Sequence, residues 1–173
     1  ANVSHELKTP LTSISGYAET LSHEIPDEET TRRFLAVILS NAKRMQRLVD
    51  GLLDLSRIES GGWRPAPEPL DVASVTRETW NIVSDRLSDG RPALALKIEA
   101  GAETVWADPD AFRQVLTNLF DNAVRYTPAE GEIAFRAWRT DGGVLVAVKD
   151  QGPGIPREHL PRIFERFYRA DAG

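Results

Sequence analysis

The sequence predicts an α+β protein in which a helical hairpin is followed by an α/β sandwich domain. Up to about residue 60, apolar side chains recur at alternating four- and three-residue spacings, which favours two long amphipathic helices. After residue 69, short apolar runs alternate with helical patterns. A stretch rich in glycine and proline separates the two regions. We therefore predict a helical domain at 1–62, a linker at 63–69 and a second domain at 70–173.

The first helix is predicted from the start of the chain to about residue 24. His5 lies opposite the apolar seam of this helix, so its imidazole is expected on the exposed face. Pro10 removes one helical hydrogen bond, and a bend is expected just past His5. Taken alone, His5 could still be an ordinary surface residue. The seam consists of Val3, Leu7, Pro10, Ile14, Tyr17 and Leu21.

A second helix is predicted after a turn at residues 25–27 and extends to about residue 60, because Pro26 and Asp27 are good helix-start residues. Two helices alone would leave their seams partly exposed. We therefore expect a homodimer that closes a four-helix bundle, the alternative being a hairpin packed only on its own second domain. The second seam consists of Phe34, Ile38, Asn41, Met45, Leu48, Leu52 and Leu55.

The second domain is predicted as helices on one face of a sheet. Helices are expected at 73–87 and 109–126, with a hairpin whose turn lies at 141–143. One apolar stripe of the later helix is assigned to Phe112, Val115, Leu116, Leu119 and Ala123. The strands are expected near 68–72, 93–99, 103–107, 132–139 and 144–149.

Composition excludes several kinds of site. The 173 residues carry 21 basic and 26 acidic side chains, a net charge of −5, which does not suggest a nucleic-acid-binding surface. The absence of cysteine excludes disulfides and thiolate chemistry, and three histidines make a histidine-built zinc site unexpected. His23 and His159 are interpreted as surface residues. No apolar run is long enough to cross a bilayer, and an upstream continuation of the chain is expected to carry any sensor or anchor.

Two polar motifs in the second domain suggest nucleotide chemistry. Asn118 and Asn122 are four residues apart on one flank of a helix, where amide oxygens can ligate Mg²⁺ and Arg125 can meet phosphate. Asp150 follows an apolar strand, where its carboxylate can accept a hydrogen bond from an exocyclic amine. Gly152 and the next glycine permit close backbone approach. The alternatives are solvated asparagines and a plain Asp-Gly turn, and the P-loop pattern is absent.

Several segments resemble, in the same order, the boxes of two-component sensor histidine kinases. The phosphoacceptor box is matched by His5, Glu6, Thr9 and Pro10. Residues 118–127 match the N box, residues 150–154 match the first glycine box, and residues 163–168 resemble the F box. The resemblance spans nearly the whole chain. It implies a dimerisation and histidine phosphotransfer domain followed by an ATP-binding domain of the gyrase and chaperone type.

This resemblance implies a role for each matched residue. His5 would accept the γ-phosphoryl group of ATP, Glu6 would orient its ring, and Thr9 would orient water for dephosphorylation of the partner. Asn122 would ligate Mg²⁺. The other nucleotide contacts would come from Asn118, Arg125, Tyr126, Asp150, Gly152 and Gly154.

The expected cofactors are therefore ATP and Mg²⁺, and the expected partner is the receiver domain of a response regulator. The chain would be the cytoplasmic portion of a membrane-anchored protein. The family's lid, second glycine box and last strands would follow Gly173, so this stretch alone is not expected to bind ATP fully. Two alternatives are a non-catalytic dimeric adaptor and a gyrase-like ATPase. A gyrase-like ATPase normally uses a glutamate upstream on the asparagine-bearing helix to activate water. This alternative is disfavoured because this chain has Gln114 and Thr117 in that region.

Overall fold

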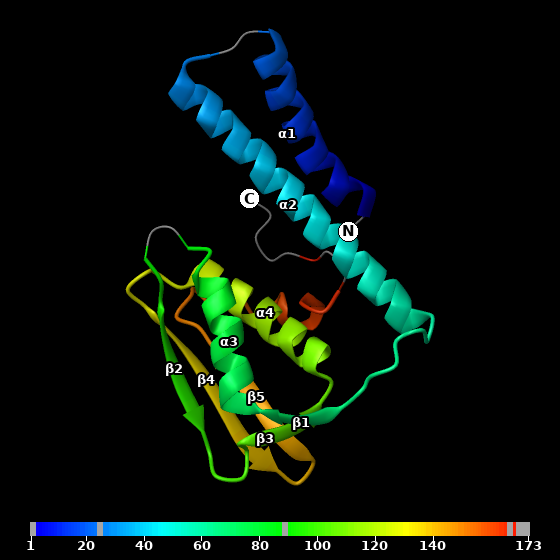
Figure 1. The fold of residues 1–173 in the computed structure, drawn as a ribbon, viewed down its shortest axis with the longest axis vertical. Helices are drawn as coiled ribbons and strands as arrows, with labels where there is room; N and C mark the ends of the chain where they lie inside the picture. The colour runs from blue at the N-terminus through cyan, green and yellow to red at the C-terminus, as the bar shows by residue number, and fades with distance from the viewer. Residues whose placement is uncertain (1–2, 24–25, 88–89, 166–167, 169–173) are drawn as a thin grey trace. The chain divides into compact units, whose positions relative to one another are not determined.

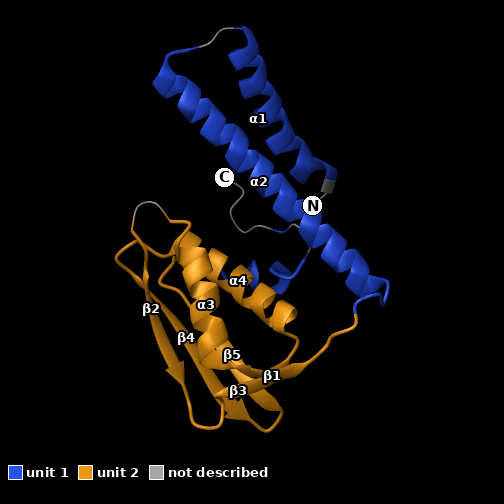
Figure 2. Cartoon of the chain, in the orientation of Figure 1, with its two compact units in different colours: residues 1–63, 155–173 blue, residues 64–154 orange. Residues whose placement is uncertain are grey.

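The computed structural model describes residues 3–23, 26–87, 90–165 and 168. The chain forms two compact units, one containing residues 1–63 and 155–173 and the other containing residues 64–154 (Figure 2). None of the helices in these described ranges is both long enough and apolar enough to cross a membrane.

The first unit is built on a hairpin of α1 (Val3–His23) and α2 (Glu28–Glu59), which lie side by side (Figure 1). The rings of Tyr17 and Phe34 pack with their centroids 4.9 Å apart, and the Asn41 amide donates to the Ser13 hydroxyl at 3.3 Å. Pro10 is buried, and the other described seam residues of both helices are half-buried, which confirms the predicted seams. The side chain of Val3 and the expected turn residue Ile25 lie outside the described residues.

Local hydrogen bonds explain where α2 begins and ends. Asp27 accepts from the Thr30 amide at 2.9 Å, which caps the helix and lowers the pKa of Asp27. At the other end the Gly62 amide donates to the Arg57 carbonyl at 3.0 Å, and the Gly61 amide donates to the Ile58 carbonyl at 3.1 Å. These two bonds form a Schellman motif, so the glycines end the helix near the predicted position.

The second unit contains two small sheets and two helices. β1 (Glu68–Asp71) pairs antiparallel with β3 (Thr104–Ala107). β4 (Glu132–Thr140) lies between β2 (Ala93–Ile98), to which it is parallel, and β5 (Gly143–Lys149), to which it is antiparallel. The helices α3 (Val72–Ser84) and α4 (Pro109–Tyr126) cover one face of the three-stranded sheet (Figure 1). Every predicted element is present, with small shifts at the ends.

The core of this unit lies between the helices and the sheet. Trp80 of α3 packs edge-on against Phe120 of α4, with ring centroids 5.4 Å apart. Alternate strand residues such as Ile133 and Phe135 are fully buried against them, as period-two patterning requires. The sequence expectation for α4 is wrong in two places: Val115 and Leu119 are 51% and 37% exposed. The buried stripe of α4 is instead Leu116, Phe120 and Ala123.

Candidate functional site

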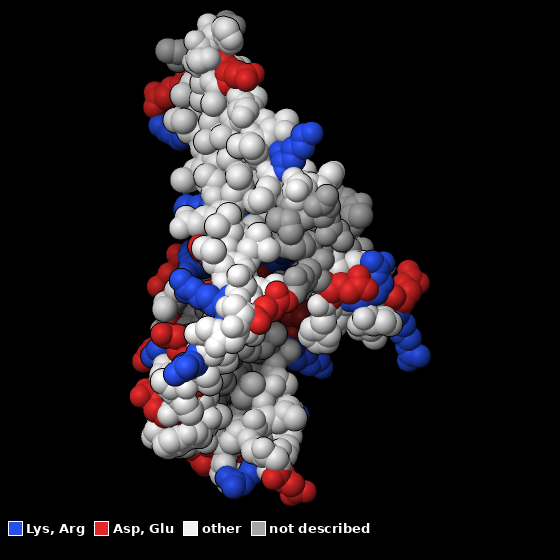
Figure 3. All heavy atoms as spheres, turned by 90° about the vertical axis from the view of Figure 1, so that its right-hand side faces the viewer, with Lys and Arg blue, Asp and Glu red and all other residues white. Residues whose placement is uncertain are grey.

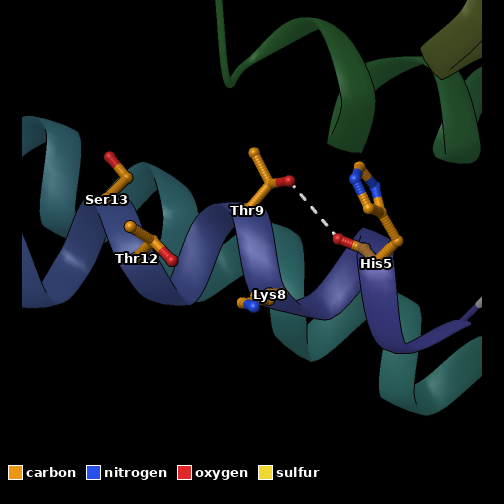
Figure 4. Close-up of a pocket in the computed structure, with 5 residues that line it drawn as sticks. All are labelled: His5, Lys8, Thr9, Thr12 and Ser13. Carbon is orange, nitrogen blue, oxygen red and sulfur yellow. Dashed lines mark hydrogen bonds between the residues drawn. The ribbon is translucent and has the colours of Figure 1, made fainter.

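His5 lies on the exposed face of α1, as its position opposite the seam predicts. Thr9 stands one turn further along, and its hydroxyl donates to the His5 carbonyl oxygen at 3.3 Å. Together with Lys8, Thr12 and Ser13 these residues line an open hollow (Figure 4). The hollow therefore offers an accessible imidazole, a cation and several hydroxyl groups within three turns of one helix.

Glu6 does not face the imidazole. Its carboxylate accepts a hydrogen bond from Arg44 of α2 at 3.3 Å, and the two side chains are only 22% and 39% exposed. In the described part of the chain, no hydrogen bond joins Glu6 to His5, because consecutive side chains on a helix point in different directions. Sequence reasoning assigned no role to Arg44. Its distance along the chain from Glu6 leaves no local signal for the pair.

The asparagine-bearing helix α4 begins at a well-formed cap. One carboxylate oxygen of Asp108 accepts from the amides of Asp110 and Ala111, each at 3.0 Å, and the other accepts from Ala66 at 2.9 Å. The Ala111 and Ala66 bonds hold the pKa of Asp108 below its usual range. This capping carboxylate, with Pro109 at the first helical turn, fixes where α4 starts and therefore how its later residues are placed.

The predicted nucleotide residues of α4 lie on its exposed side. Asn118 and Asn122 are exposed and one turn apart, flanking the buried Phe120. The Arg125 guanidinium lies 5.4 Å from the centroid of the Tyr126 ring, a cation–π contact at the end of the helix. Amide oxygens that face solvent are available to a cation and its water shell, so the helix fits the predicted chemistry.

The loop that follows β5, residues 150–154, lies against the end of α4 and is called the Asp-Gly loop below. The Gly152 amide donates to the Asp150 carboxylate at 2.8 Å. A Cβ at Gly152 would stand 2.8 Å from the Tyr126 Cβ and 3.1 Å from its carbonyl oxygen, so only glycine allows this approach. The structure therefore brings Tyr126, Asp150 and Gly152 together, while Gly154 lies exposed at the end of the same loop.

Gln151, to which the sequence assigned no role, connects this loop to two other segments. The Gln151 side-chain oxygen accepts from the Glu132 amide at 3.0 Å, and the Gln151 amide donates to the Thr127 hydroxyl at 3.4 Å. The partners of Gln151 therefore come from the first residue of β4 and from the residue that caps the end of α4.

The segment that precedes and includes the F box shows one further correction. His159 is half-buried rather than a plain surface residue, because its ring nitrogen hydrogen-bonds the Tyr168 hydroxyl. Arg162 lies 4.1 Å from the Tyr168 ring centroid and pairs with Glu165 at 3.0 Å. Arg166 and Phe167 of this box lie outside the described residues. His23 is exposed, as expected.

Within the described ranges, no group of three or more carboxylate or histidine side chains could hold a metal ion. Mg²⁺ is commonly held by one or two protein oxygens with water and phosphate as its other ligands, so such a group is not required for the predicted cation. Acidic and basic side chains are interspersed on the face shown in Figure 3, so this face offers an anionic ligand no broad positive patch.

Comparison with protein families matches both ends of the chain. Residues 1–61 match the His Kinase A (phospho-acceptor) domain, and residues 107–173 match the histidine kinase-, DNA gyrase B-, and HSP90-like ATPase family. The second match includes residues 155–173.

Relatives and solved structures agree with the family matches. The phosphate regulon sensor protein PhoR of Pseudomonas aeruginosa is 39% identical over 99% of this chain, and the sensor protein SrrB of Staphylococcus aureus is 38% identical over 99%. The chain spans 39% and 30% of the lengths of these relatives.

Two solved structures are similar in fold. The histidine kinase AdeS of Acinetobacter baumannii has a TM-score of 0.75 and 28% identity over 89% of this chain and 76% of its own. ThkA, solved in complex with the response regulator protein TrrA, has a TM-score of 0.79 at 24% identity over 96% of this chain and 49% of its own. With family matches at both ends and relatives aligned across nearly all of its length, the chain belongs to the two-component sensor histidine kinases and carries their phosphoacceptor and ATP-binding domains.

Proposed function

We propose that this chain is the catalytic core of a kinase in which His5 accepts the γ-phosphoryl group of ATP and passes it to an aspartate of a response-regulator receiver domain. The observation that carries the proposal is the exposed imidazole of His5, set in an open hollow with Thr9 one turn away. Helix α4 and the Asp-Gly loop supply a second set of residues suited to ATP. The domain boundary belongs at the linker, residues 63–69.

The chemistry proposed at His5 is nucleophilic. A neutral imidazole nitrogen forms a bond to the γ-phosphorus while the bond from phosphorus to the ADP oxygen breaks. The proton on the other ring nitrogen needs an acceptor, and Glu6 is the adjacent carboxylate. In the described conformation Arg44 of α2 holds the Glu6 carboxylate. Glu6 must turn away from Arg44 to reach the His5 ring. Thr9 would orient a water molecule during dephosphorylation of the partner.

The nucleotide would be held by side chains of α4 and the Asp-Gly loop. Asn122 would ligate Mg²⁺, and Asn118 and Arg125 would contact phosphate. Bound ATP supplies the phosphoryl group, and Mg²⁺ offsets its negative charge. Asp150 would accept a hydrogen bond from the adenine amino group beside Tyr126, and Gly152 and Gly154 would allow close backbone approach. The core would act in the cytoplasm, because it would take its phosphoryl group from ATP.

The experiment that tests this proposal is labelling of the intact kinase with γ-phosphate-labelled ATP and Mg²⁺. We expect a label that is labile in acid and stable in base, and Asn122→Ala should prevent it because the proposed cation ligand is lost. Asn81→Ala makes the same change at an exposed position of α3 and should label normally. Normal labelling of Asn122→Ala would contradict the magnesium role. Phosphate release without protein labelling would favour the ATPase alternative. If neither phosphate release nor labelling occurred, the adaptor alternative would be favoured.

Homodimerisation is part of the proposal and is supported by a second apolar stripe on α2. Leu35, Leu39 and Leu53 are 53%, 55% and 54% exposed, and Val49 is 42% exposed. With Ala42 and Gln46 they follow the four- and three-residue spacing of a helix seam, on a side of α2 that does not face α1. A second copy would bury this stripe in a four-helix bundle.

The double change Leu39→Glu and Leu53→Glu should therefore convert the dimer to a monomer, because it places two charges in the proposed interface. Ser40→Glu adds a charge to the neighbouring exposed face of α2 and should leave the dimer intact. Light scattering measures the mass, and circular dichroism checks that the helices remain. A monomeric wild type, or a dimer that survives the double change, would contradict this interface.

A further inference from the structure

Gln151 closes the end of the β4–β5 ladder with its side chain instead of its main chain. The antiparallel register pairs Ala134 with Lys149, so its continuation places Gln151 opposite Glu132. In a continued ladder the Glu132 amide would donate to a main-chain carbonyl. Here it donates to the Gln151 side-chain oxygen at 3.0 Å. The Gln151 side chain therefore pairs with the first residue of β4, while the main chain leaves the ladder after Lys149.

The released main chain turns toward the end of α4. The Gln151 amide donates to the Thr127 hydroxyl at 3.4 Å, and Thr127 is 8% exposed. Gly131 passes close to the bond between Glu132 and Gln151, since a Cβ at Gly131 would stand 2.6 Å from Thr127 Cγ2 and 3.1 Å from Gln151 Oε1. Three segments therefore meet at Gln151: the end of α4, the start of β4 and the Asp-Gly loop.

The neighbours of Gln151 in the chain are the residues that need this placement. Asp150 precedes Gln151 and Gly152 follows it. Gly152 lies so close to α4 that a Cβ on it would stand 2.8 Å from the Tyr126 Cβ. If the main chain instead continued along β4, the loop would leave α4, and Asp150 would lose its position beside Tyr126. We propose that Gln151 is a positioning residue for nucleotide binding, whose side-chain carbonyl holds the Asp150 loop against the end of α4.

This inference rests on the proposed function, because it assigns Gln151 to the same ATP site. A positioning role depends on the acceptor oxygen, whereas a packing role depends on side-chain shape. Gln151→Met keeps the length of the side chain and removes the acceptor, and Gln151→Glu keeps an acceptor at the same place. Thr140 provides a matched control, because its hydroxyl donates to the Gly143 carbonyl at 3.2 Å and closes the other end of the same strand pair.

The experiment measures KM for ATP, kcat for autophosphorylation and equilibrium ADP affinity in the intact kinase, in about 0.3 M salt to screen the added charge of Gln151→Glu. Gln151→Met should raise KM and weaken ADP binding by about 3- to 10-fold, the range expected for one hydrogen bond, with kcat nearly unchanged. Gln151→Glu should stay close to wild type. Thr140→Val should leave nucleotide affinity unchanged, and hydrogen exchange at the Glu132 amide should accelerate in Gln151→Met alone.

The outcomes separate this inference from the function on which it rests. A wild-type kinase that binds no nucleotide would overturn the proposed function and the role of Gln151 with it. Wild-type binding that Gln151→Met leaves unchanged would overturn the inference alone. So would a Gln151→Glu variant that binds more weakly than Gln151→Met, since that order indicates packing, or an unchanged exchange rate at Glu132.

Discussion

Replacing His5 with Gln should reduce phosphate incorporation from ATP to background in the intact kinase. The amide of Gln is polar and similar in length to imidazole, but its nitrogen lone pair is delocalised and is a poor nucleophile. His5 is exposed on α1, so the change removes the acceptor atom without opening the helix seam. ADP affinity should stay at the wild-type value, because the proposed nucleotide residues lie on α4 and the Asp-Gly loop.

The chain supplies a close control for this prediction. His23 is also an exposed histidine of α1, at its last turn, and His23→Gln should incorporate phosphate normally. The measurement is labelling with γ-phosphate-labelled ATP, followed by acid and base treatment of the denatured protein. Label that persists in His5→Gln would show that the acceptor is another residue. Loss of label in both variants would indicate a general effect on α1.

The exposure of His5 could be predicted from sequence because its signals are local. The position of His5 opposite a heptad seam fixes its exposure, and the residues that follow it within two turns complete the phosphoacceptor box. The state of Glu6 could not be predicted in this way. Its partner Arg44 lies on the other helix, and only the packing of α1 against α2 brings the two charges to 3.3 Å.

The nucleotide side shows the same division between local and distant information. The sequence pattern predicted a helix at 109–126, and the cap at Asp108 explains why α4 begins where that prediction places it. The replacement of a ladder bond by the Gln151 side chain had no signal in the pattern, because it depends on the strand register and on where α4 ends. Residues that bind can be recognised by type, but the residues that hold them in place depend on tertiary contacts.

The buried face of α4 is the clearest case of ambiguity within one helix. Leu119 and Phe120 are adjacent and both apolar, so a seam of period 3.6 can pass through either one. The sequence expectation chose Leu119, which is 37% exposed, whereas Phe120 is fully buried. The large aromatic ring packs against Trp80, and a leucine at that place would make fewer contacts with Trp80.

Phe120→Ala should therefore destabilise the second unit by about 3–5 kcal/mol, the usual cost of truncating a fully buried phenylalanine. Domains of this size are stable by only about 5–15 kcal/mol, so the loss corresponds to a fall of the thermal midpoint by more than about 10 °C. Leu119→Ala removes a neighbouring but partly exposed side chain and should cost less than about 1.5 kcal/mol. Thermal unfolding followed by near-ultraviolet circular dichroism measures both, and equal shifts would contradict the assignment of the buried face.

The same substitution tests how the core of the second unit supports its site. Phe120 lies between Asn118 and Asn122 on α4 but points to the opposite side of the helix, into the sheet. If it acts only through the stability of the unit, ADP affinity of Phe120→Ala should approach the wild-type value well below the new midpoint and be lost above it. Weak binding at every temperature would instead mean that the ring also sets the register of α4, and with it the spacing of the asparagines from the Asp-Gly loop.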